Sequence, residues 1–178
     1  MKKGTYFCAL LILLAGCQTS GQPEEDRERT QLQQEIEALE KQLIEAVDVR
    51  KDREAALQLL EKSATYATNY PADSLSPIYL FKAADVARGA GEYGKAIKLW
   101  GDMWRTYEDH PRAPEALFLQ GFTYDNHLRD AYQAGRYYRN FLEKYPDHPF
   151  AEQARQLLSV LDKSPEELVR EFEQRGQE

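Results

Sequence analysis

Residues 77–149 contain two copies of one sequence pattern, and this duplication limits the folds that the chain can adopt. Leu80 matches Leu117 and Phe81 matches Phe118, so the first halves of the copies lie 37 residues apart. The second halves lie 38 apart, with these matches: Ala96/Ala134, Trp100/Tyr138, Met103/Phe141, Tyr107/Tyr145 and Asp109-His110-Pro111/Asp147-His148-Pro149. One inserted residue explains the change. Such a repeat predicts supersecondary units that bury their apolar faces by stacking.

Large, small and aromatic residues recur at fixed spacings inside the copies: Leu80, Ala84, Ala87, Ala96 and Trp100, then Leu117, Gly121, Tyr124, Ala134, Tyr138 and Pro146. This pattern resembles the tetratricopeptide (TPR) repeat, a pair of antiparallel helices in which small residues let the helices approach closely. Gly91 stands at the usual inter-helix glycine, where the second copy has Leu128. The resemblance covers about residues 50–162. It implies an all-α, TPR-like α-solenoid of antiparallel helix pairs over residues 50–178.

The N-terminus predicts a membrane anchor. Two lysines precede an apolar run from Phe7 to Ala15, which is too short to span a bilayer and fits a signal peptide over residues 1–16. The sequence Leu14-Ala15-Gly16-Cys17 resembles a bacterial lipobox, which implies cleavage before Cys17 and attachment of lipid to its sulfur. We expect no other cofactor. Several acyl chains would tether the protein durably without a transmembrane helix.

The residue after Cys17 predicts the membrane at which the protein is located, and the net charge disfavours two kinds of ligand. Gln18 is not the Asp that retains resembling lipoproteins at the inner membrane, so we expect the outer membrane, with the protein on its periplasmic face. The net charge of −7 becomes −9 once the two signal-peptide lysines are removed. Nucleic-acid binding needs a basic footprint, and broad adhesion to anionic lipid needs basic clusters, so both are disfavoured.

The segment before the repeats predicts a tether and then a helix. Residues 17–25 are polar, contain Gly and Pro, and predict a flexible tether. Residues 26–49 carry one apolar seam, formed by Leu32, Ile36, Leu39, Leu43 and Ala46 or Val47. Two interpretations stay open: an amphipathic helix that packs on the repeats, or a short coiled coil through which the chain forms homo-oligomers.

The two ends of the repeat region predict atypical units. A helix from Asp52 to Asn69 ends in Tyr70-Pro71, like Tyr145-Pro146, which indicates the second half of a degenerate leading repeat. Ser76 is the expected N-cap of the helix that follows. Residues 164–167, Ser-Pro-Glu-Glu, resemble a capping box that would begin a C-terminal helix covering the open end of the stack.

The sequence offers no catalytic constellation. His110 and His148 repeat in Asp-His-Pro turns about 38 residues apart, and His127 is expected in an inter-helix loop. A metal site needs converging ligands of defined number, so we interpret these histidines as polar turn residues and expect no metal site. Cys8 would leave with the signal peptide, and neither hydrolase motifs nor a phosphate loop occur. We predict that the protein is not an enzyme.

A stack of helix pairs offers a binding surface. In TPR proteins the first helix of each pair lines the concave side, and the alignment places seven residues there: Phe81, Asp85, Arg88, Phe118, Phe122, Asp125 and Asn126. Phenylalanines beside acidic groups suggest a groove for an apolar or aromatic peptide with some basic character. The expected partner is an envelope protein or peptide.

Two functions follow from these features. The first is a lipid-anchored scaffold or adaptor, similar to the BamD-like periplasmic TPR proteins, which implies a role in outer-membrane protein assembly. The second is a self-associating structural protein of envelope integrity or division, similar to the YbgF-like proteins of the Tol–Pal system. The chain combines the lipobox of the first kind with the N-terminal helix of the second.

Overall fold

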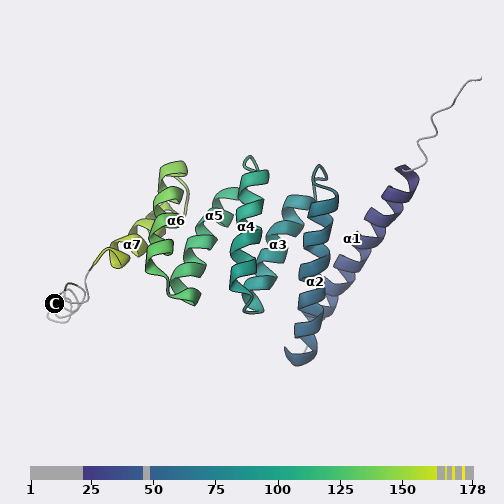
Figure 1. Cartoon of the computed structure of the whole chain (residues 1–178), viewed down its shortest axis with the longest axis horizontal. Helices are drawn as coiled ribbons and strands as arrows, with labels where there is room; N and C mark the ends of the chain where they lie inside the picture. The colour runs from purple at the N-terminus through teal and green to yellow at the C-terminus, as the bar shows by residue number, and fades with distance from the viewer. Residues whose placement is uncertain (1–21, 46–48, 164–166, 168–169, 171–173, 175–178) are drawn as a thin grey trace, which may run out of the picture.

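The structure, a computed structural model, describes residues 22–45, 49–163, 167, 170 and 174. These residues form an all-helical protein, and no strand occurs among them. The elements are α1 (Gln22–Glu45), α2 (Val49–Asn69), α3 (Ser76–Gly89), α4 (Tyr93–Thr106), α5 (Ala113–Thr123), the π-helical turn η1 (Tyr124–Leu128), α6 (Ala131–Lys144) and α7 (Ala151–Leu161). Consecutive helices pack against each other and follow one another along the long axis in chain order (Figure 1).

Helix α1 packs on its own chain. It extends from Gln22 to Glu45, so it begins inside the segment 17–25 that we expected to be a flexible tether, and the seam positions 46 and 47 lie outside the described residues. Ile36 is fully buried against Leu59 of α2 and Tyr79 of α3, and the other seam leucines are half-buried in the same cluster: Leu32, Leu39 and Leu43. The structure therefore uses the apolar seam for packing within the chain.

The same turn follows three helices. Backbone N–H groups of Asp73, His110 and His148 donate to the carbonyls of Tyr70, Tyr107 and Tyr145, and those of Ser76, Ala113 and Ala151 donate to the carbonyls of Asp73, His110 and His148. Tyr107 and Tyr145 share a non-helical conformation, with φ of −125° and −133° and ψ of 53° and 57°. The tyrosines that begin the three turns lie 37 and 38 residues apart, so the sequence repeat is also a repeat of structure. Helix α2 ends in the same turn as α4 and α6.

The turn also resolves the register of α2. Ala96 and Ala134 lie 11 residues before Tyr107 and Tyr145, whereas Ala56 of α2 lies 14 residues before Tyr70. Leu59 lies 11 residues before Tyr70, as Ala96 does before Tyr107, and it is 3% exposed. A leucine therefore replaces the alanine in this leading copy, and packing against α1 accommodates its size.

The two hairpin loops differ by one residue. After α3, Gly91 adopts a left-handed φ of 83°, and the N–H of Glu92 donates to the carbonyl of Ala87. After η1, Arg129 takes the left-handed position with φ of 56°, and the N–H of Asp130 donates across a wider turn to Tyr124. The π-helical turn absorbs the inserted residue. The counterpart of Gly91 is therefore Arg129, not the aligned Leu128.

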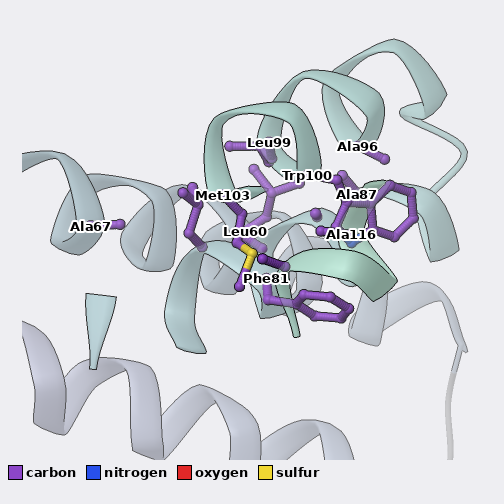
Figure 2. Packing of buried hydrophobic residues seen from close by; sticks show 13 residues of the cluster. Leu60, Ala67, Phe81, Ala87, Ala96, Leu99, Trp100, Met103 and Ala116 are labelled. Carbon is purple, nitrogen blue, oxygen red and sulfur yellow. The ribbon is translucent and has the colours of Figure 1, made fainter. Parts of the chain in front are cut away.

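Small residues set the distance between paired helices. In the central cluster, Phe81 and Trp100 are fully buried with their ring centroids 6.4 Å apart, together with Ala87 and Met103 (Figure 2). At Gly121 a Cβ atom would lie 3.0 Å from side-chain atoms of the facing helix α6, so any larger residue would require Tyr137 and Tyr138 to shift. Close approach of α5 and α6 depends on that missing side chain.

The start of α3 differs from the expectation. Ser76 is the first residue of α3 and is not its N-cap; its hydroxyl donates to the carbonyl of Tyr70 at 2.5 Å, while Pro77 occupies the first turn. Ser76 is fully buried, and its hydrogen bond to Tyr70 links the start of the helix to the preceding turn. The signal peptide, Cys17 and most of the expected C-terminal capping helix lie outside the described residues.

Candidate functional site

The expectation that Phe81 lines an open groove is wrong, because its side chain is fully buried. Its ring packs against Trp100, and the guanidinium carbon of Arg112 lies 3.4 Å from the ring centroid. An arginine over an aromatic face is held by the ring quadrupole. Phe81 therefore supports the surface from beneath and does not meet a ligand.

Phe118 is likewise a core residue, 4% exposed, so the expectation is wrong for this side chain too. It contacts Phe141 and Phe150, with centroid separations of 5.6 and 5.0 Å. Phe122 lies next along the helix, 6.2 Å from Phe118, and is half-buried. Of the three phenylalanines, only Phe122 offers part of its ring to solvent.

Two residues at equivalent positions of the repeat cover the two buried phenylalanines. Arg112 lies over Phe81 and Phe150 packs on Phe118, and the two covering residues lie 38 apart, as the repeat requires. A guanidinium thus replaces a phenyl ring at the same place. Arginine adds a planar charged face where the other copy has only an apolar one.

Arg112 is part of a charged cluster between α3 and the start of α5. It pairs with both carboxylate oxygens of Glu115, at 2.8 and 3.0 Å, and the closest approach of Asp85 to Arg88 is 4.0 Å. We call these four residues the α3–α5 face. Burial raises the pKa of the Asp85 carboxyl and Glu115 raises it further, while Arg112 and Arg88 act in the opposite direction. The Nε of Arg88 is buried with no hydrogen-bond partner.

Asp125 and Asn126 lie in the π-helical turn on the next hairpin, with Phe122 just before them. The hydroxyl of Tyr138 donates to Asp125 at 3.3 Å, and the amide of Asn126 donates to the carbonyl of Phe122 at 3.2 Å. Asn126 remains exposed. The structure therefore divides the expected surface into two groups, one on α3 and one at the end of α5.

The repeated histidines have a structural role. Nδ1 of His110 accepts a hydrogen bond from the N–H of Arg112, and Nδ1 of His148 accepts one from Phe150, both at 3.2 Å. In the leading copy the carboxylate of Asp73 accepts from Leu75 in the same way at 2.9 Å. The interpretation as polar turn residues is confirmed for these two histidines. Among the described residues, no group of three or more His, Cys, Asp or Glu could hold a metal ion.

Sequence reasoning missed Arg112, Glu115 and an aromatic stack. His127, expected in a loop, stacks on Tyr93 with centroids 4.5 Å apart and an interplanar angle of 15°. This contact joins the second hairpin to the start of α4. Arg112 follows the Asp-His-Pro turn and could have been found by aligning it with Phe150.

The part of the chain that the structure describes contains no helix long and apolar enough to cross a membrane. Comparisons of the chain with protein-family models and with curated proteins found no match.

Proposed function

We propose that this chain is a lipid-anchored, TPR-like adaptor that binds another protein at the outer membrane. The observation that carries the proposal is the threefold recurrence of one turn, with Tyr70, Tyr107 and Tyr145 at its start. It supports a stack of equivalent helix pairs whose cores use matching positions. Stacked pairs leave extended side surfaces free, and such proteins use these surfaces for binding.

The proposed location at the membrane follows from the lipobox-like sequence that ends at Cys17. The helices would stand off the membrane on a short polar segment, with net negative charge keeping the domain away from anionic head groups. In cell fractionation, we expect the wild-type chain in the outer-membrane fraction and the Cys17→Ser chain in the soluble periplasmic fraction. Recovery of both in one fraction would contradict the anchor.

The proposed contact surface is the α3–α5 face together with the exposed part of the π-helical turn. Asp85 presents a half-buried carboxylate on α3, and Asn126 presents an exposed amide in the π-helical turn, where it donates to the carbonyl of the half-buried Phe122. Protein interfaces commonly place an aromatic anchor among polar groups. We therefore propose a partner segment that carries an apolar or aromatic side chain and some basic character.

The experiment is mild in-cell crosslinking, followed by affinity capture of the full chain from detergent-solubilised envelopes. We compare wild type with an Asp85→Asn, Asn126→Ala variant and with a control, Gln58→Ala, Gln153→Ala, changed at exposed positions on α2 and α7. The adaptor predicts a defined partner with wild type and control, and less of it with the first variant. Circular dichroism verifies that all three are folded.

The competing hypothesis is a self-associating envelope protein whose α1 pairs with a second copy. In the structure the seam residue Ile36 is fully buried against α2 and α3, so this surface is already used. That observation favours the adaptor. Capture of the chain alone, unaffected by either variant, would support self-association instead.

A further inference from the structure

A pocket of about 540 Å³ lies between α4, α5 and α6, and its lining includes no residue of the α3–α5 face. Three of its lining residues are arginines: Arg105 on α4, and Arg136 and Arg139 on α6. Glu143 is the one acidic residue in the lining. The volume falls in the range of small-ligand sites. The pocket concentrates positive charge in a chain whose net charge is −7.

Two of these arginines are held by acidic residues outside the pocket. Nη2 of Arg105 pairs with Asp102 at 2.7 Å, and Nη2 of Arg139 pairs with Asp162 at 3.0 Å. A guanidinium has five N–H donors, so each arginine keeps donors for a further partner. Arg136 donates to the neutral side chain of Gln133 at 3.1 Å and has no acidic partner among the ion pairs of the described residues.

Two glycines inside helices make room for the held arginines. A Cβ at Gly135 would lie 3.1 Å from Nη1 of Arg139, and a Cβ at Gly101 would lie 3.0 Å from Nη1 of Arg105. Glycine inside a helix is less favourable than alanine, so the space has an energetic cost. The guanidinium groups of Arg105 and Arg139 occupy that space, with Nη1 as the atom nearest to each glycine.

Neutral donors complete the lining. Gln120 is 1% exposed, and its amide donates only at 3.4 Å to the carbonyl of Ala116. The indole Nε1 of Trp104 is buried with no hydrogen-bond partner. A buried donor without a partner is costly, and an acceptor from a ligand would relieve that cost. The amide of Asn140 lies in the same wall.

We propose that this pocket binds a segment of a partner protein that carries two or more carboxylates. Arginine forks match carboxylates in two-point hydrogen bonds. The donors are spread between Arg105 on one helix and Arg136 and Arg139 on another, around a space far larger than one phosphate needs. Trp104 and Tyr137 add apolar walls for the backbone and side-chain methylenes of a peptide. The site shares no lining residue with the α3–α5 face and does not need the membrane anchor.

The test uses the full chain purified in a neutral detergent and a fluorescein-labelled peptide with four Glu spaced by Gly and Ser. We expect saturable binding by fluorescence polarisation, weakened by salt. A copy of the peptide with Gln in place of Glu should not bind. The Arg136→Gln variant should weaken binding about tenfold, because it removes a charge-assisted partner. The control, Arg27→Gln, removes an equal charge from an exposed position on α1 and should leave binding unchanged.

Gly135→Ala separates this site from general charge attraction. The added methyl displaces the Arg139 guanidinium, so we expect weaker peptide binding together with unchanged or increased thermal stability. Equal weakening by Arg27→Gln, equal binding of the Gln peptide, or full competition by equimolar inorganic phosphate would each overturn the proposal. Because purified protein is used, failure here leaves the partner-capture experiment on envelopes unaffected.

Discussion

Nδ1 of His148 accepts a hydrogen bond from the main-chain N–H of Phe150 at 3.2 Å. His110 and Asp73 accept from the second residue after themselves in the same way, so two residue types perform one task at three matching positions. The acceptor closes the turn before the next helix begins. The repeat therefore preserves hydrogen-bonding chemistry even where the residue changes.

This equivalence predicts the effect of substitutions at His148. His148→Ala removes the acceptor and should lower the free energy of unfolding by about 0.5–1.5 kcal/mol. His148→Asp supplies the acceptor that Asp73 provides in the leading copy and should lose less. Urea unfolding followed by circular dichroism measures both. Equal losses in the two variants would show that the hydrogen bond contributes nothing.

The close approach of α5 and α6 predicts that Gly121→Ala is destabilising. The new Cβ would lie 3.0 Å from Cβ of Tyr137 and from the ring of the fully buried Tyr138, neither of which can move freely. We expect a loss of about 1–3 kcal/mol by chemical denaturation. Gly94→Ala meets no atom within 4 Å and serves as the control, with unchanged or slightly higher stability.

Buried tyrosines predict alkaline unfolding. Burial raises the pKa of Tyr66 and of Tyr79 to about 12, while the unfolded chain ionises near pH 10. Between these values the unfolded state binds fewer protons than the folded state, so stability falls as pH rises from about 10 to 12. Below pH 10 this contribution is complete.

We expect each tyrosine to contribute about 1–3 kcal/mol to that loss. Unfolding free energies at pH 8, 10 and 11, with tyrosinate absorbance recorded in parallel, measure it. Tyr79→Phe should flatten the pH dependence, whereas Tyr132→Phe, at a 74% exposed position, should leave it unchanged. A constant unfolding free energy across this range would contradict the prediction.

Because Arg112 covers the ring of Phe81, two substitutions of Arg112 should differ in their effect on stability. Arg112→Ala removes the guanidinium from the ring and should cost about 1–2 kcal/mol. Arg112→Phe imitates Phe150 in the other copy and should recover part of that loss. Thermal unfolding measures both variants, and equal destabilisation would show that covering the ring is not the role of this position.

The repeated segment predicted most of the helices, because apolar positions within one copy, such as Ala96, Trp100 and Met103, are spaced by the helical period and recur in the other copy. The same alignment misplaced two site residues. A phenylalanine on the first helix of a pair can point to solvent or into the stack, and spacing alone does not distinguish these directions. Arg112 and Phe150 settle it, because each covers one of these phenylalanines, and both lie far from it in sequence.

Local backbone geometry could also not be predicted from the sequence. Leu128 aligns with Gly91, yet the left-handed residue is Arg129, because a π-helical turn absorbs the inserted residue. Arginine gives no sign of a positive φ, which usually indicates glycine or asparagine. The arginine pocket was missed for a related reason: Arg105 and Arg139 lie on different helices, and only their packing brings them together.

The most direct test of the adaptor is site-specific photocrosslinking in living cells. A photoreactive amino acid replaces Asn126 on the proposed contact surface or, as the control, the exposed Gln58 on α2. Our account predicts that illumination joins the Asn126-substituted chain to one envelope protein of defined mass, while the Gln58-substituted chain gives none of that product. Identical products from both positions, or a product containing only this chain, would contradict an adaptor that binds through this surface.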